Sequence, residues 1–138
     1  MQRLTACLAM LCAFAGAWAH DAARCSRDMA RKAEEAASAV SSWGELYSAY
    51  QKYAQCDDAA VGEGFSDSVG RLLSGHGGAL PELFALTTKD ASFEQFVVKH
   101  VDETIPSDTL DAIQTNVRRN CPRDAVPLCR NILRAAKH

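Results

Sequence analysis

The sequence predicts a small all-α domain, a single helical bundle of six to seven helices tied by two disulfides. Apolar residues recur every three or four positions in successive segments, which is the spacing of a helix with one buried face. No segment sustains the two-residue alternation of a strand, and no Asn-Gly or Asp-Gly pair marks a hairpin. Proline, glycine and capping residues separate these segments, so each can be assigned in order.

The first 19 residues have the pattern of an export signal. A basic residue, Arg3, precedes a mostly apolar run, which ends in Ala-Trp-Ala at residues 17–19, the small-x-small pattern that a signal peptidase cleaves. The apolar run is too short for a good membrane span, and no later run is long enough. We therefore expect residues 1–19 to be a signal peptide and residues 20–138 to be one exported domain, periplasmic or secreted.

Four cysteines remain after the predicted cleavage, and an even number in an exported chain favours disulfides. A metal site is disfavoured because no Cys-x-x-Cys pair is present and the histidines do not stand at ligand spacing, so no cofactor is expected. Of the three possible connectivities, we prefer Cys25–Cys56, which closes the open end of the first helical hairpin. Cys121–Cys129 is then the second bridge, across a turn.

The charge of the mature chain excludes one class of partner. Removing residues 1–19 removes Arg3 and no acidic residue, which leaves 14 basic against 17 acidic residues and a net charge of −3. A protein whose main ligand is nucleic acid needs a basic surface to neutralise phosphates. We therefore expect no nucleic-acid partner.

Two helices and a tight turn are predicted first. Residues 26–40 carry an apolar stripe made mostly of alanine, with Ser26 as the cap, so any helix that packs there must approach closely. Ser42 and Glu45 form a capping box for a second helix that extends to about residue 54 and carries large aromatic side chains. The short turn between them predicts an antiparallel hairpin.

The third helix is expected after Asp57 or Asp58, either of which can cap it, and it ends at the glycine-rich loop of residues 74–78. Small residues recur every four positions along it, at Gly62, Ser66 and Gly70. This spacing lets another helix backbone come close, and the alanine stripe of the first helix is the expected neighbour. The alternative is a helix of a partner protein.

Four shorter helices are expected in the second half of the chain. Pro81 and Pro127 belong in the first turns of the fourth and seventh helices, where a missing N–H does no harm. Ser92 is the expected cap of the fifth helix, and Ser107 or Asp108 caps the sixth. The expected ranges are 81–86, 92–104, 107–119 and 124–136.

An acidic group on the third helix is the candidate recognition surface. It consists of Asp57, Asp58, Glu63 and Asp67, followed by Arg71. On a helical wheel Glu63 and Asp67 point away from the apolar stripe, and Arg71 stands one turn after Asp67, where the two can pair. The simplest interpretation is a solvated face with acidic caps at the positive end of the helix. The alternative is a surface that recognises a partner.

Serine and histidine supply a weaker catalytic hypothesis. Residues 64–68, Gly-Phe-Ser-Asp-Ser, resemble a nucleophile elbow, but the final glycine and the preceding strand are missing. His100 falls within an apolar stripe, which is typical of a hydrogen-bonded core histidine, and His76 lies in the glycine loop. No catalytic residue is therefore assigned.

A basic group near the C-terminus balances the acidic helix. In this position it is typical of a solvated face where cations are favoured, although it can also meet the acidic residues of the third helix. Membrane or polyanion binding would need a denser cluster. The group consists of Arg118, Arg119, Arg123, Arg130, Arg134 and Lys137.

The class of chain suggests its function by analogy. An exported, disulfide-tied helical domain without catalytic motifs is expected to be a protein-binding module, such as an inhibitor, an immunity protein or an envelope accessory protein. Its partner would be another envelope or secreted protein. The alternative is a small hydrolase or metal-dependent enzyme that uses Glu63 and Asp67 with His76 or His100.

Overall fold

A computed structural model describes residues 25–76 and 78–137 of the chain, so the predicted signal peptide lies outside the described residues. Within these residues the chain forms seven α-helices, two short 3₁₀ turns and no β-strand, which confirms the all-α class. The helices are α1 (Arg27–Ser38), α2 (Trp43–Tyr53), α3 (Ala59–Leu73), α4 (Leu80–Lys89), α5 (Ala91–Lys99), α6 (Ser107–Asn120) and α7 (Val126–Ala135), and the turns are η1 (Ala54–Cys56) and η2 (Arg123–Ala125).

No helix in the described part of the chain is both long enough and apolar enough to cross a membrane.

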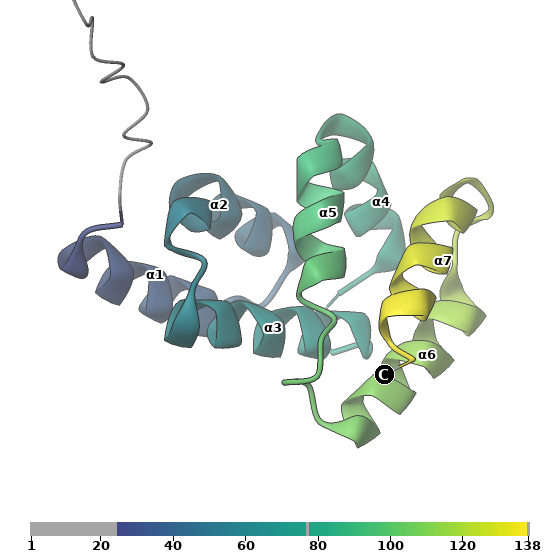
Figure 1. Ribbon diagram of the computed structural model, residues 1–138. Helices are drawn as coiled ribbons and strands as arrows, with labels where there is room; N and C mark the ends of the chain where they lie inside the picture. Colours follow the sequence, from purple (N-terminus) through teal and green to yellow (C-terminus); the bar gives the residue numbers. More distant parts are fainter. Residues whose placement is uncertain (1–24, 77, 138) are drawn as a thin grey trace, which may run out of the picture.

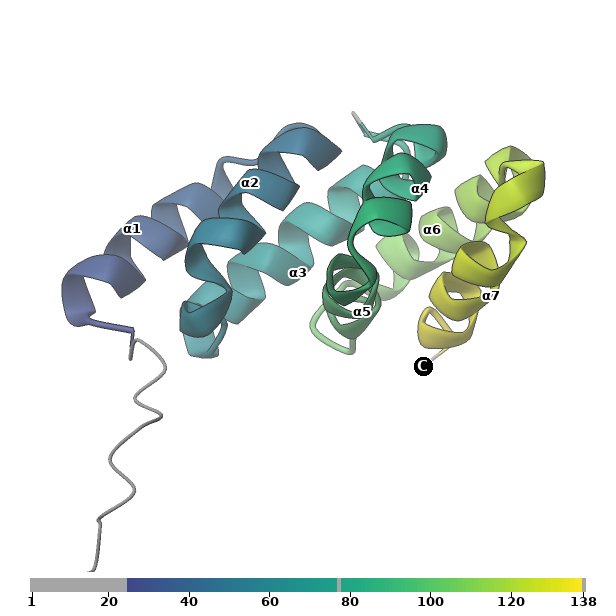
Figure 2. The ribbon, with the colours of Figure 1, turned by 90° about the horizontal axis from the view of Figure 1, so that it is seen from above.

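The helices form two layers (Figures 1 and 2). Helices α1, α3 and α6 lie side by side in one layer, and α2, the α4–α5 pair and α7 follow one another in the second layer, with α7 beside α6 at the end of the molecule. The α1–α2 hairpin is therefore at one end of the molecule and the α6–α7 pair is at the other. Helix α3 contacts both α1 and α6, which makes it the central helix of its layer.

Aromatic side chains join the two layers at the centre. Phe65 of α3 meets Phe96 of α5 edge to face, with ring centroids 5.0 Å apart. Tyr50 of α2 packs on Phe96 at 4.8 Å and on Phe93 at 5.3 Å. Aromatic pairs at these separations stabilise beyond the area they bury, so this cluster fixes α2 and α5 against α3.

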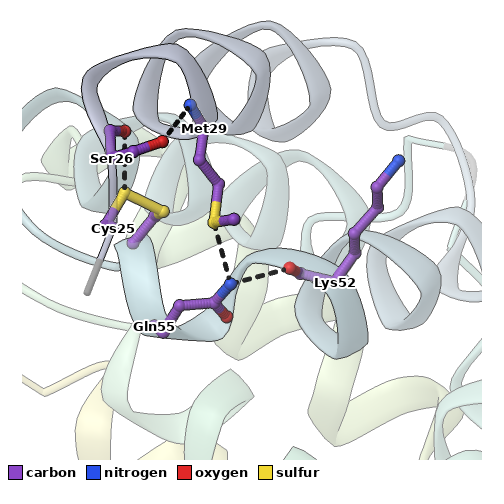
Figure 3. Close-up of a disulfide and its surroundings, with 6 residues drawn as sticks. Cys25, Ser26, Met29, Lys52 and Gln55 are labelled. Atoms are coloured by element: carbon purple, nitrogen blue, oxygen red, sulfur yellow. Dashed lines mark hydrogen bonds between the residues drawn. A yellow bond between two sulfur atoms is a disulfide. The ribbon is translucent and has the colours of Figure 1, made fainter. Parts of the chain in front are cut away.

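The first predicted disulfide is confirmed. Cys25 and Cys56 are bonded, with their Cα atoms 5.0 Å apart, at the open end of the α1–α2 hairpin. Figure 3 shows how Gln55 reaches across the same end, where its amide nitrogen lies 3.1 Å from both the Met29 sulfur and the Lys52 carbonyl oxygen. The covalent and polar contacts together hold the start of α1 against the end of α2.

The second predicted disulfide is also confirmed, because the chain between its cysteines is not one continuous helix. Cys121 follows the end of α6, and the turn η2 separates it from α7, so its Cα lies 6.2 Å from that of Cys129. A straight helix of eight residues would have separated them by about 12 Å. The same turn corrects the predicted start of the seventh helix, which begins at Val126 and not at Asp124.

Two predicted caps are wrong. Asp90 caps α5 in place of Ser92, because its carboxylate accepts hydrogen bonds from the N–H of Ser92 (2.9 Å) and of the next residue (3.2 Å). Helix α6 begins at Ser107 itself, with Pro106 preceding it and no side-chain cap. In both cases the helix begins earlier than a serine cap would require, after Asp90 and after Pro106.

The expected packing of the small-residue ridge is wrong as well. Gly62, Ser66 and Gly70 do not receive α1. The alanine stripe of α1 instead meets α3 at Gly64, where an added Cβ would lie 3.2 Å from the Cβ of Ala37. Gly70 faces the loop after α5 and the start of α6. The close contact between α1 and α3 therefore forms at Gly64, which is not part of the repeat of Gly62, Ser66 and Gly70.

Candidate functional site

The acidic residues predicted to share one surface are divided between the surface and the interior. Glu63 and Asp67 are exposed on α3, and Asp58 caps the helix by accepting a hydrogen bond from the N–H of Ala59 at 2.8 Å. The side chain of Asp57 is only 9% exposed and turns toward α5. The predicted group of four carboxylates is thus three surface groups and one interior group.

Arg71 joins α3 to the α1–α2 turn. Its guanidinium donates to Asp67 (Nε–Oδ2 3.1 Å), as the sequence predicts, and also to the Val40 carbonyl oxygen (3.1 Å) and the Ser68 hydroxyl (2.9 Å). A planar guanidinium can hold several acceptors in fixed directions, which suits this bridging position. Arg71 is therefore a structural residue as well as a neighbour of the acidic surface.

A hollow of about 280 Å³ lies beside the acidic surface. Helix α3 forms one wall, with Glu63, Asp67 and Arg71 on it, and the segment leading into and beginning α6 forms the other, with Ile105 and Pro106 between Thr104 and Thr109. Gly70 lines the same hollow, and its missing side chain lets the two walls approach. We call this feature, with its two carboxylates, the acidic hollow.

Beneath that surface lies a buried polar network that the sequence did not predict. The hydroxyl of Ser66 lies 2.9 Å from Nδ1 of His100 and 2.9 Å from Oδ2 of Asp102. On the other side of the ring, Nε2 of His100 lies 3.1 Å from Oδ2 of Asp57, which also accepts from Lys99 at 2.7 Å. The network joins α3 to the end of α5, across 34 to 43 residues of sequence.

The order of hydroxyl, imidazole and carboxylate is that of a hydrolase triad, but these groups do not reach a substrate. A nucleophilic serine must stand where the scissile carbonyl can approach it. Ser66 is 2% exposed and His100 is 3% exposed. The acidic hollow is lined by the neighbours of Ser66 and not by Ser66 itself. The network therefore fixes α5 on α3 and does not form an active site.

Burial sets the protonation of the network. It lowers the pKa of the His100 imidazole, and the charge and hydrogen bond of Asp57 offset this only in part. Burial raises the pKa of Asp102, but hydrogen bonds from Thr104 and Ser66 outweigh it, so this pKa lies below its usual value. Neutral His100 then donates from Nε2 to Asp57, and its Nδ1 is an acceptor that competes with Asp102 for the Ser66 hydroxyl proton.

The Ser66 hydroxyl has one proton and two acceptors within reach, Nδ1 of His100 and the Asp102 carboxylate, so it couples Asp102 to the ring. While His100 is neutral, the hydroxyl proton serves either Nδ1 or the Asp102 carboxylate. When His100 gains a proton, Nδ1 becomes a donor to the Ser66 oxygen, and the hydroxyl can then donate to Asp102. The hydrogen bonds of the network thus change direction with one proton.

The residues of the predicted enzyme alternative are not brought together. His100 contacts Asp57 and Ser66, whereas exposed His76 contacts the hydroxyl of Ser74 at 3.0 Å. In the described ranges, no hydrogen bond or ion pair joins Glu63 or Asp67 to either histidine. Among the same residues, no group of three or more histidine, cysteine, aspartate or glutamate side chains is placed to hold a metal ion.

Comparisons of the chain with protein-family models, with curated proteins and with solved structures found no significant match.

Proposed function

We propose that this chain is a small exported module that binds another protein, as inhibitors, immunity proteins and accessory factors of the cell envelope do. The observation that carries the proposal is the contrast between a sealed interior and an open acidic hollow. The groups with catalytic chemistry, Ser66 and His100, are buried, whereas Glu63 and Asp67 are exposed beside a hollow whose opposite wall combines apolar residues and threonines.

Export is part of the proposal. Two disulfides in a chain of this size fit folding in an oxidising compartment, and the N-terminal pattern fits a signal for the same route. A small rigid helical domain held by two covalent bridges also suits recognition, because a preorganised surface loses little conformational freedom on binding.

The acidic hollow indicates the chemistry of the partner. Arg71 also lines the hollow and pairs with Asp67, so the two carboxylates leave it with one net negative charge, which favours a basic side chain. The wall that contains Ile105 and Pro106 favours an apolar neighbour to that side chain. Complementary charge of this kind raises the association rate and selects against acidic partners. We therefore expect the partner to present a lysine or arginine flanked by apolar residues.

The test is capture of the partner with wild-type and neutralised protein. Tagged mature chain is incubated with envelope extract, the captured protein is identified by mass spectrometry, and its affinity is then measured with purified components. Glu63→Gln with Asp67→Asn preserves shape and removes two charges. Glu34→Gln with Glu35→Gln removes two charges from the exposed face of α1 and is the matched control.

The proposal expects the α3 variant to bind at least tenfold more weakly, about 1.4 kcal/mol, while the α1 variant binds as wild type does. Equal binding by both variants would show that the acidic hollow is not the recognition surface. Circular dichroism of each variant establishes that the helices are intact.

A further inference from the structure

The far end of the molecule carries a second hollow with a different character. It lies between the end of α6 and the outer side of α7, and its volume is about 540 Å³. This is within the range of roughly 300–1,000 Å³ that small-molecule sites occupy. We call it the α6–α7 groove.

The floor of the α6–α7 groove is apolar and is shaped by the second disulfide. Leu133 of α7 and Cys121 of the bridge are partly buried and supply its accessible surface, whereas Val117 of α6 and Cys129 are 0% and 5% exposed and lie beneath them. Val126 stands at its edge and is 47% exposed, the one exposed large hydrophobic side chain among the described residues. An alkyl chain lying on this floor would cover apolar surface that now faces water.

The rim of the same groove is cationic. Arg118, Arg130, Arg134 and Lys137 line it, and all four are exposed. Arg118 donates to Gln114 at 3.0 Å, and none of the four forms an ion pair with an acidic residue in the part of the chain that the structure describes. The groove thus concentrates unneutralised positive charge on a chain whose net charge is negative.

The helical spacing of α7 places apolar and cationic groups side by side. Taking about 100° per residue from Val126, Leu133 falls near 340°, whereas Arg130 and Arg134 fall near 40° and 80°. The apolar row and the arginine row therefore run next to each other along the helix. Adjacent guanidinium groups can bind the oxygens of a carboxylate or phosphate in pairs.

We propose that the α6–α7 groove binds a single-chain anionic amphiphile, a molecule with one alkyl or acyl chain and a carboxylate or phosphate head. The chain lies against Val126, Leu133 and the disulfide, and the head is held by Arg130 and Arg134 at the rim. A free fatty acid and a monoacyl phospholipid share this chemistry. The site is separate from the acidic hollow, so it extends the proposed function without depending on it.

A bilayer surface fits the same residues less well. Membrane-bound helices insert several large apolar side chains below the headgroups. In this groove Val126 is the single large apolar side chain that is exposed among the described residues, and Leu133 is partly buried in the wall. The accessible apolar surface is therefore small and lies within an open groove, which suits one alkyl chain more than a flat membrane.

The test measures binding of defined probes to the purified mature chain by isothermal titration calorimetry. The probes are dodecanoate and monododecyl phosphate below their critical micelle concentrations, dodecyl maltoside as a neutral chain, and phosphatidylglycerol vesicles as a membrane. We expect one site for each anionic probe, at least tenfold weaker binding of the neutral one, and no vesicle binding. Stronger binding of dodecanoate than of the phosphate would indicate a fatty acid as the source, and the reverse order would indicate a monoacyl phospholipid.

Two variants test separately the residues that bind the anionic head and the residue that contacts the alkyl chain. Arg130→Gln with Arg134→Gln is expected to weaken binding of both anionic probes at least tenfold, and Val126→Ser to weaken it severalfold. Arg119→Gln with Arg123→Gln removes two exposed arginines of the same region that do not line the groove, and should leave binding unchanged. Thermal unfolding of each variant establishes that it is folded.

The proposal is overturned if neither anionic probe binds up to 1 mM (roughly −4 kcal/mol), or if the two arginine pairs have equal effects. Binding to vesicles without binding to the single-chain probes would also overturn it, in favour of a membrane surface. Failure of the acidic hollow to bind a partner protein leaves these outcomes unaffected, because the two sets of variants change different surfaces of the molecule.

Discussion

The two disulfides are expected to stabilise the fold unequally, and the difference can be worked out from their positions. Cys25 and Cys56 are 31 residues apart, whereas Cys121 and Cys129 are 8 apart. A bridge removes entropy from the unfolded chain, and it removes more when it closes a longer loop. The perturbation is replacement of each pair by alanine, in two separate variants.

The loop-entropy relation gives about 3.7 kcal/mol at 25 °C for the 31-residue separation and about 2.5 kcal/mol for the 8-residue separation. The effects of burial cancel in the comparison, because each bridge has one partly buried cysteine and one fully buried cysteine. Cys56 is 4% exposed and Cys129 is 5% exposed. The expected difference between the variants is therefore about 1.2 kcal/mol.

The assay is equilibrium unfolding in urea, followed by circular dichroism, on the mature wild type and both variants. With a slope of about 1.5–2 kcal/mol per molar, the Cys25–Cys56 variant should unfold about 0.6–0.8 M earlier than the Cys121–Cys129 variant. If the Cys121–Cys129 variant is equally or less stable, loop closure does not govern these bridges. Looser packing of α7 against α6 would then be the larger effect.

Three further predictions concern the interior. The pKa of His100 is lower in the fold than in the unfolded chain, so its contribution to stability should be complete above about pH 6.5 and should decrease as the pH falls from there toward the folded pKa. Urea titrations between about pH 7.5 and 5 should show this slope, and His100→Gln should flatten it. Gly78→Ala should cost about 1–3 kcal/mol, since its Cβ would lie 2.5 Å from the Leu72 carbonyl oxygen, and thermal unfolding measures the loss. Arg71→Gln should cost about 1–3 kcal/mol by leaving the Val40 carbonyl without its charged donor, and Arg71→Lys should restore less than half of the loss.

Each of these three predictions would be contradicted by a specific result. A wild-type protein as stable at pH 5 as at pH 7.5 would contradict the depressed pKa of His100. An alanine at position 78 without effect would show that the loop before α4 yields easily. Full rescue by lysine at position 71 would mean that charge alone, and not the planar guanidinium, holds the α1–α2 turn to α3.

Much of the fold follows from local signals in the sequence. The capping serines Ser26 and Ser42 accept the hydrogen bonds expected of them, from the N–H groups of Met29 and Glu45, because a cap depends on residues within one turn. The Asp67–Arg71 pair also forms as predicted, since it needs only the spacing of one helix. The disulfide connectivity was predictable because short turns limit which cysteines can meet.

The buried network could not be predicted from the sequence, for a physical reason. Its partners are distant: His100 meets Ser66 across 34 residues and Asp57 across 43. The apolar stripe around His100 indicated a histidine in need of a hydrogen-bond partner, but the packing of α5 on α3 decides which residue supplies it. The same packing moves Asp57 from the predicted acidic surface into the interior.

The sequence by itself therefore determined the helices, most of their ends, the disulfides and the outward direction of Glu63 and Asp67, all of which depend on contacts within a few residues. Only the tertiary structure decided which helix faces meet, and with them the two hollows. The acidic hollow exists because the segment before α6 crosses α3 at Gly70, and the α6–α7 groove exists because the Cys121–Cys129 turn sets α7 against the end of α6. Such crossings depend on side-chain packing between segments far apart in the chain, and local spacing carries little information about them.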